Sequence, residues 1–225
     1  GTLANGGKYA LLEKPTKGDK ITANITLRFG DENSLTSKSE TGALLAKMLI
    51  AGTTTRTREQ IADELDRLKT NIRFGGGPGT LSISLSTDKA NLPAALALLE
   101  DMLKNPRFDN AEFEKTVVET KAEYEANKNE PMNLAGEKLN KLISAYPKGH
   151  PFYATSTDEA LEELSKVTLN DLKKYYTDFY GANNSASTFV GELDKGKIKT
   201  FLENTLGKWS SKSSYAQLVP RYFDV

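Results

Sequence analysis

The sequence predicts an α+β fold in which helices pack on one face of a largely antiparallel sheet. Two observations favour this fold: strand patterns occur in neighbouring pairs, and helical patterns are grouped in long runs elsewhere in the chain. Neighbouring strands pair most simply as antiparallel hairpins, and helices grouped apart from such a sheet cover one of its faces. We expect a single domain over residues 1–215, followed by a linker over 216–225 toward a further subdomain.

The first strand pair is predicted over residues 8–14 and 21–29. In the second of these segments apolar and polar residues alternate, which indicates one buried face and one solvated or polar-covered face. Residues 15–19 between the strands are typical of a hairpin-like turn. We therefore expect the two strands to pair directly and antiparallel.

Two helices follow this strand pair. The first is predicted over residues 37–49, with Ser37 or Ser39 as its N-cap. The second runs from Thr57 to Leu68, where Gln60 stands three residues after Thr57 as in a capping box. Both carry apolar bands typical of helices that lie against a core.

A second strand pair is predicted over residues 72–74 and 80–87, and it flanks the glycine-rich segment 75–79. Such a segment could cradle a phosphate, but no Gly-Lys-Ser/Thr follows it and the next element is a strand rather than a helix N-terminus. We interpret residues 75–79 as a loop.

The remaining elements are helical except for one late strand over residues 185–190. Asn91 is expected to cap the first of the helices, and Thr168 with Asp171 to form a capping box on another. The expected helices cover residues 92–103, 110–127, 132–145, 158–164, 169–179 and 197–206.

Composition excludes several classes of function. The 30 basic and 30 acidic residues balance and are interspersed, so no basic stripe is available for nucleic acid or an anionic membrane. The longest apolar stretch, residues 44–51, is interrupted by Lys47 and is far shorter than a membrane span of about 20 residues. The absence of cysteine excludes disulfides and thiolate metal sites and does not indicate a compartment.

Other side chains that could carry chemistry are better explained by structure. His150 is the only histidine, so a two-His metal site or a Ser-His-Asp triad is excluded, and its Gly-His-Pro context favours a turn. The acidic groups around Glu123 and Glu162 have lysines at helical spacing, which is typical of solvated faces. The aromatic cluster at 175–180 indicates core packing rather than stacking on bases.

The most informative pattern lies in the first predicted helix. Ala43, Ala46 and Lys47 stand at i, i+3 and i+4, followed by Met48-Leu49 and Gly52-Thr53. Two His at i and i+4 can bind one zinc ion, and a Glu between them can activate the bound water. Neither His nor Glu is present at these three positions, and by themselves they describe an ordinary amphipathic helix.

Segments elsewhere in the chain change this interpretation. They are Leu3 with Asn5-Gly6-Gly7, Arg28 through Leu35, Gly52-Thr53, Val117-Val118, and Gly149-His150-Pro151. With them, nearly the whole chain resembles the pitrilysin/insulinase-like zinc metallopeptidases of the processing-peptidase type. In that family the corresponding helix reads His-x-x-Glu-His, so the resemblance implies that Ala43 and Lys47 replace the two zinc-binding His and Ala46 the catalytic Glu.

The resemblance also implies a third replaced ligand. The family carries its third ligand at the end of a Glu-Arg-x-Val-Val-x-x-Glu pattern, and residues 114–121 end instead in Lys121. It follows that this segment has no catalytic, cofactor-binding or metal-binding residues and is expected to be inactive alone. We also hypothesise that Lys47 and Lys121 face the same former cavity and pair with Glu40 or Glu114.

The family resemblance implies a role for the segment. It is similar to the first subdomain of the non-catalytic C-terminal half, which helps enclose an unfolded peptide in a chamber opposite the zinc-bearing half. The implied partners are that catalytic half, on the same or another chain, and the peptide; zinc is expected in the catalytic half only. The alternative is a structural or assembly protein of the same fold, as in respiratory-complex core subunits. The resemblance alone suggests a bacterial periplasm or cell envelope.

Overall fold

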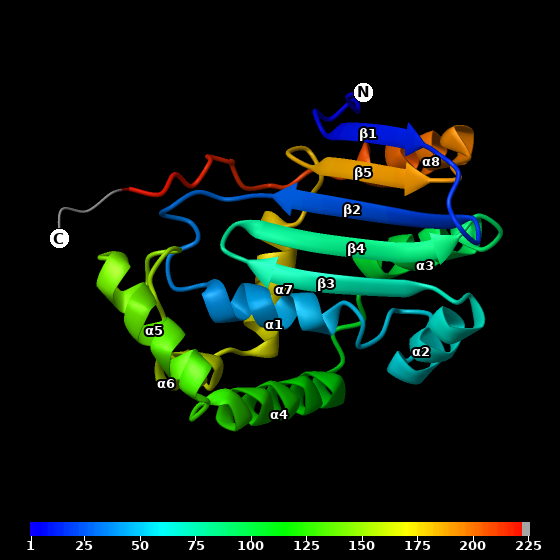
Figure 1. Ribbon diagram of the computed structural model, residues 1–225. Helices are drawn as coiled ribbons and strands as arrows, with labels where there is room; N and C mark the ends of the chain where they lie inside the picture. The colour runs from blue at the N-terminus through cyan, green and yellow to red at the C-terminus, as the bar shows by residue number, and fades with distance from the viewer. Residues whose placement is uncertain (222–225) are drawn as a thin grey trace.

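Five strands form one sheet in the order β1-β5-β2-β4-β3 (Figure 1). In this computed structural model, which describes residues 1–221, every neighbouring pair is antiparallel except β1 with β5. The predicted α+β class and the largely antiparallel sheet are therefore confirmed. The strands are β1 (Lys8–Glu13), β2 (Lys20–Arg28), β3 (Asn71–Gly77), β4 (Thr80–Asp88) and β5 (Ala186–Gly191).

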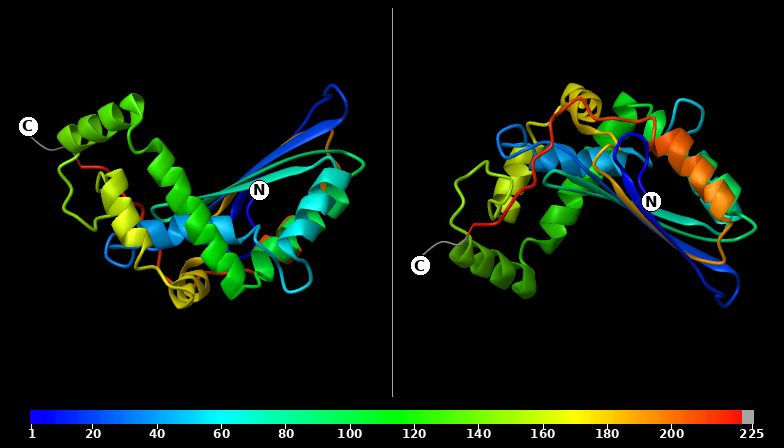
Figure 2. Two further views of the ribbon diagram at one scale, coloured as in Figure 1. Left: turned by 90° about the horizontal axis from the view of Figure 1, so that it is seen from below. Right: turned by 90° about the horizontal axis from the view of Figure 1, so that it is seen from above.

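Helices cover one face of this sheet and extend beyond its β3 edge (Figure 2). Among residues 1–221, none of them combines the length and apolar character that a bilayer crossing requires. The helices are α1 (Ser39–Met48), α2 (Arg58–Arg67), α3 (Leu92–Lys104), α4 (Asn110–Asn127), α5 (Pro131–Ile143), α6 (Thr157–Leu164), α7 (Leu169–Phe179) and α8 (Lys195–Phe201), with a π-helical turn at Leu202–Leu206.

The core lies between the covered face of the sheet and the helices. Along β2 the burial pattern alternates, so that Ile21, Ile25 and Leu27 are buried while Thr22 and Asn24 are exposed. The same alternation along β4 confirms that the two central strands share one apolar and one polar face. The polar face carries no helix, which leaves it open on the side opposite α3, α7 and α8 (Figure 2).

The predicted hairpin between the first two strands was wrong. β5 lies between β1 and β2, pairing parallel with β1 through Lys8 and Ala186 and antiparallel with β2 through Ile25 and Ser187. Residues 16–19 do form a turn, with positive φ at Asp19, but this turn connects two strands that are separated in the sheet by β5. The residue pattern of β1 and β2 cannot predict the insertion of β5, because β5 comes from a distant part of the chain.

Two local predictions also need correction. The N-cap of α1 is Lys38, neither Ser37 nor Ser39, and no side chain of the cap bonds the helix. Asn91 is the N-cap of α3 as predicted, although its side chain makes no bond to the helix. The glycines 75–77 belong to β3, so that only Pro78 and Gly79 remain as the turn. The capping boxes on α2 and α7 are present as predicted.

The segment after the last helix packs along the domain. The backbone N–H of Ala216 donates to the carbonyl of Gly30, and that of Arg221 donates to Oη of Tyr146, just beyond α5. The guanidinium of Arg221 also lies 3.0 Å from a carboxylate oxygen of Glu32. The predicted linker thus begins in contact with the domain, and its last four residues, Tyr222, Phe223, Asp224 and Val225, lie outside the described part of the chain.

Glu159 in the first turn of α6 connects that helix to α5. Its carboxylate accepts hydrogen bonds from the backbone and hydroxyl of Ser156, from Oη of Tyr153 and from Nζ of Lys141 on α5. The backbone bond from Ser156 is the strongest influence; with the others it outweighs desolvation and lowers the pKa of Glu159 to about 2.

We expect this lowered pKa to make the stability that Glu159 contributes depend on pH. A carboxyl group with a pKa lower in the folded state stabilises the fold above its unfolded value and stops doing so as pH falls through the folded pKa. The difference in unfolding free energy between wild type and Glu159→Gln should therefore be largest near neutrality and shrink between about pH 4.5 and pH 2. Urea unfolding at several pH values measures it, and a constant difference would contradict the assignment.

Candidate functional site

The helix with the altered zinc motif, α1, lies close against β3. A Cβ on Gly76 of β3 would lie 2.3 Å from the carbonyl oxygen of Gly42, so glycine is required for this contact. Ala46, the predicted counterpart of the family's catalytic Glu, is 1% exposed, whereas Ala43 and Lys47, the predicted counterparts of its two His, are partly exposed. Ala43 and Lys47 therefore lie on the accessible side of α1, and Ala46 is packed into the core.

Lys47 reaches across to α4. Its Nζ lies 2.5 Å from a carboxylate oxygen of Glu123 and 3.1 Å from Oγ1 of Thr120. The hypothesis that Lys47 pairs with Glu40 or Glu114 was wrong, because its ion pair is with Glu123, nine residues beyond Glu114 on α4. Glu40 instead accepts a hydrogen bond from Oη of Tyr124, and Glu114 one from Asn110.

Lys121, the predicted third-ligand position, is also on α4 and partly buried. At about 100° per residue, it projects roughly 160° around the helix from Glu123, the residue that Lys47 contacts. The side chains do not suit a zinc ion, because Ala43 offers no donor atom and the ammonium groups of Lys47 and Lys121 have no lone pair. Within residues 1–221, no cluster of three or more His, Asp or Glu side chains could hold a metal ion.

A second polar cluster fastens α4 to the start of α2. The guanidinium of Arg58 donates to Glu112 at 2.6 Å, to Glu119 at 3.2 Å and to Oγ1 of Thr116 at 2.8 Å. Further along α4, burial and the neighbouring carboxylate of Glu40 raise the pKa of Tyr124. Ion pairs and hydrogen bonds therefore link α4 to both α1 and α2.

The loop after α1 contains the Gly-Thr pair of the motif and is held by Asp101 of α3. Asp101 accepts hydrogen bonds from Oγ1 of Thr53 at 2.7 Å, Oγ1 of Thr55 at 3.0 Å and Nη1 of Arg56 at 2.6 Å, and also from Asn105. Burial raises the pKa of Asp101, but these four bonds outweigh burial and hold the pKa below its usual value. This network fixes the loop at the end of α1. The sequence analysis did not predict it, although a single Asp in the apolar helix α3 could have indicated a buried acceptor.

His150 has the structural role that its Gly-His-Pro context indicated. Its ring stacks on Tyr146, with centroids 4.2 Å apart, and its Nδ1 accepts a hydrogen bond from the backbone N–H of Phe152. Its Nε2 lies 3.2 Å from a carboxylate oxygen of Glu32, which also pairs with Arg221. His150 thus joins two loops to the segment at 216–221.

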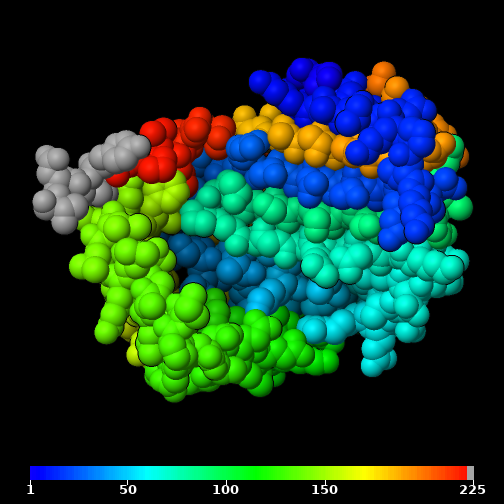
Figure 3. Space-filling model, in the orientation of Figure 1, coloured from blue at the N-terminus to red at the C-terminus, as the bar shows by residue number. Residues whose placement is uncertain are grey.

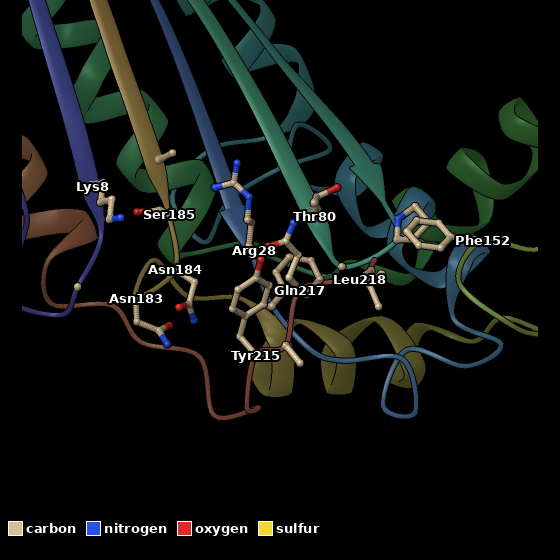
Figure 4. Close-up of a pocket in the computed structure, with 16 residues that line it drawn as sticks. Lys8, Arg28, Thr80, Phe152, Asn183, Asn184, Ser185, Tyr215, Gln217 and Leu218 are labelled. Atoms are coloured by element: carbon tan, nitrogen blue, oxygen red, sulfur yellow. The ribbon is translucent and has the colours of Figure 1, made fainter. Parts of the chain in front are cut away.

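A pocket of about 590 Å³ opens where that segment crosses the end of the sheet (Figure 4). Its charged lining residues are Lys8 and Arg28, beside the amides of Asn183 and Asn184 and the ring of Tyr215, and it has no acidic lining residue. No acid–base pair or activated nucleophile is formed there. The sequence did not predict this pocket, because it arises only when the last segment packs on the strands.

On the surface, a hollow lies over α1. It is bounded by β3 on one side, by α4 on the opposite side and by α5 at one end (Figure 3). The accessible side of α1 forms the floor of the hollow, and α5 stands forward of it as a rim (Figures 2 and 3).

Known proteins and solved structures match this chain over most of its length. A protein of Rickettsia felis named as an uncharacterized zinc protease is 24% identical over 88% of the chain, and the zinc protease PqqE of Helicobacter pylori is 23% identical over 88%. The matched parts are 47% and 44% of those proteins. The chain therefore spans about half the length of these relatives.

Solved structures share the fold at low sequence identity. The peptidase M16 inactive domain from Pseudomonas fluorescens matches 97% of the chain with a TM-score of 0.79 and 21% identity, over 53% of its own length. The periplasmic protease PqqL of Escherichia coli matches 99% of the chain with a TM-score of 0.76 and 15% identity, over 25% of its own length.

Two family models cover nearly the whole sequence. Residues 10–156 match the model described as insulinase, peptidase family M16, and residues 166–224 match the one described as peptidase M16 inactive domain. The first match alone spans the altered motif on α1 and all of α4. The family predicted from the sequence is therefore confirmed: this chain belongs to the insulinase family, peptidase family M16.

Proposed function

We propose that the chain is a non-catalytic segment of a zinc-dependent metalloendopeptidase and forms part of the wall that encloses a peptide opposite the zinc-bearing half. The observation that carries this proposal is the chemistry of α1. Its motif positions hold Ala43, Ala46 and Lys47, and the ammonium of Lys47 is paired with Glu123. A positive charge at that place repels a metal cation, and none of the three motif side chains can activate water.

The lengths of the relatives support a partner. Proteins named zinc proteases are about twice as long as the part that this chain matches, so such proteins hold a further segment of similar size. We place the zinc ion in that further segment, on this or another polypeptide.

The shape of the open side supports a role in holding peptide. The hollow over α1 lies beside the uncovered polar face of the sheet (Figure 3). The sheet order leaves β1 and β3 as edge strands, and residues 1–3 already pair with the start of β1. Unpaired backbone groups at a strand edge can bind an extended peptide largely independently of its sequence.

Reconstitution tests the proposal. The zinc-bearing M16 half, with an intact His-x-x-Glu-His helix, and this chain are purified separately, and cleavage of a fluorogenic unstructured peptide is measured for each and for the mixture. We expect no cleavage and less than about 0.1 zinc per molecule for this chain alone after dialysis against zinc, and a saturable rise in cleavage when it is added to the other half.

Two outcomes would contradict the proposal. Stoichiometric zinc with cleavage by this chain alone would mean that ligands other than the motif positions act. A stable complex with the zinc-bearing half that leaves cleavage unchanged would favour the alternative of a structural or assembly protein of the same fold.

A further inference from the structure

The helix α5 is amphipathic, and its polar side faces the protein. Asn133 donates to Oγ1 of Thr157 at 3.1 Å, and the carboxylate of Glu137 accepts hydrogen bonds from the backbone and hydroxyl of Thr157. One turn later, Nζ of Lys141 lies 3.0 Å from a carboxylate oxygen of Glu159. These three α5 residues recur at intervals of four, so they form one continuous stripe against α6.

The apolar side of α5 faces solvent. None of its residues is buried, and four of its five large apolar side chains are more than half exposed, the exception being Leu134 at 43%. At about 100° per residue, these side chains cluster on the side of the helix opposite the polar stripe. They form the α5 apolar face: Met132 (85% exposed), Leu139 (56%), Leu142 (73%) and Ile143 (64%).

The orientation of α5 is the reverse of that expected for an amphipathic helix on the surface of an isolated domain in water. A surface helix normally turns its apolar stripe toward the core and its charged stripe outward. Here hydrogen bonds from Thr157 and the pair between Lys141 and Glu159 hold the helix the other way round. A contiguous apolar patch of this kind marks a surface that another molecule covers.

The position of α5 indicates what covers it. The helix stands forward of α1 and forms one rim of the hollow rather than its floor (Figures 2 and 3). In a chamber built from two halves, the floor of the hollow contacts the enclosed peptide, whereas the rim, here α5, contacts the other half. A straight stripe over three helical turns also suits packing against a folded surface, since ridges of one helix fit grooves of another.

We propose that the α5 apolar face docks on the zinc-bearing M16 half and closes the hollow on that side. This inference rests on the proposed function and names the surface through which that function is exerted. A folded partner of sufficient size is available, because the relatives carry about as much chain again as the part matched here. A varied peptide substrate is better held by strand edges than by an apolar helix.

Aspartate substitutions on α5 test the proposal. Leu142→Asp and Leu139→Asp place a charge on the apolar face, and Asn140→Asp places the same charge on the exposed flank of the same helix. Affinity for the zinc-bearing half is measured by sedimentation velocity. We expect each leucine variant to bind at least about tenfold more weakly and the control to stay within about twofold, because a buried unpaired charge is strongly unfavourable in an interface.

A label supplies a second measurement. Since the sequence has no cysteine, Leu142→Cys gives a unique site for an environment-sensitive fluorophore, with Asn140→Cys as its control. Adding the zinc-bearing half should shift the emission of the Leu142→Cys conjugate to the blue and change that of the control far less. Equal melting temperatures of all variants alone would exclude unfolding as the cause, as expected for exposed positions.

The outcomes separate the inference from the proposed function. If wild type binds and activates the zinc-bearing half but both aspartate variants do so equally well, α5 is not the docking surface and the proposed function stands. If wild type does not bind that half at all, both proposals fail. If wild type instead self-associates and Leu142→Asp makes it monomeric, a second copy covers α5 and the inference is overturned.

Discussion

Replacing Gly76 by alanine is expected to destabilise the domain more than any other single methyl added to β3. The new Cβ would lie 2.3 Å from the carbonyl oxygen of Gly42 and 3.0 Å from Cα of Ala43, both in the backbone of α1. Because neither group can rotate away, the helix must move off the strand. We expect a loss of about 3 kcal/mol, which lowers the melting temperature by roughly 6 to 12 °C.

Gly75→Ala is the matched control for this substitution. A Cβ added to this neighbouring glycine would meet no heavy atom within 4 Å, and its φ is not positive, so alanine there should be neutral or slightly stabilising. Thermal unfolding followed by circular dichroism measures both variants. Similar melting temperatures for Gly76→Ala and Gly75→Ala would mean that α1 does not pack on β3 as described, and the placement of the motif helix would fail with it.

Asp101→Ala is expected to have an effect of similar size on the loop that ends α1. The substitution removes the shared acceptor for Thr53, Thr55, Arg56 and Asn105 and leaves the hydroxyl of Thr53, a fully buried residue, without its partner. An unsatisfied buried donor and the loss of charge-assisted bonds together destabilise by about 2 to 4 kcal/mol. Urea unfolding measures the loss, and Glu100→Ala, one residue earlier on α3, serves as its control.

The effect of Asp101 should also depend on pH. Its pKa is lower in the folded protein than in the unfolded chain, so its contribution is complete above the unfolded value near 3.8 and is lost as pH falls below it. The stabilities of wild type and Asp101→Ala should therefore converge in acid. A difference that does not shrink as pH falls below 3.8 would mean that the side chain acts by packing rather than as an ionised acceptor.

Local signals in the sequence predicted the elements whose causes are local. The alternation along β2 and β4 follows from one buried face, and the capping boxes of α2 and α7 need only residues three apart, such as Thr57 and Gln60. The cap predicted for α1 was wrong, because Lys38 rather than a serine is its N-cap. Asn91 is the N-cap of α3, but its backbone is helical rather than extended, and its side chain makes no bond to the helix.

Features that depend on distant contacts could not be predicted in the same way. The residue types around Ala43 and Lys47 predicted an altered motif, but the partner of Lys47 depends on the rotation of α4, which places Glu123 toward it. A helix at α5 was predicted from its periodicity, yet periodicity cannot tell which side faces the protein. That choice is made by Thr157 and Glu159, which come from a later helix.

The insertion of β5 between β1 and β2 determines when the sheet can be completed as the chain is synthesised. Until Ala186–Gly191 leaves the ribosome, β2 has one unpaired edge and β1 has no partner in the sheet. Contacts between residues so distant in sequence are slow to form, and unpaired edges promote association between unfinished chains. A nascent chain whose synthesis pauses before β5 would expose the unpaired edge of β2, which is prone to aggregation. Protection by chaperones is therefore most important until β5 has been synthesised.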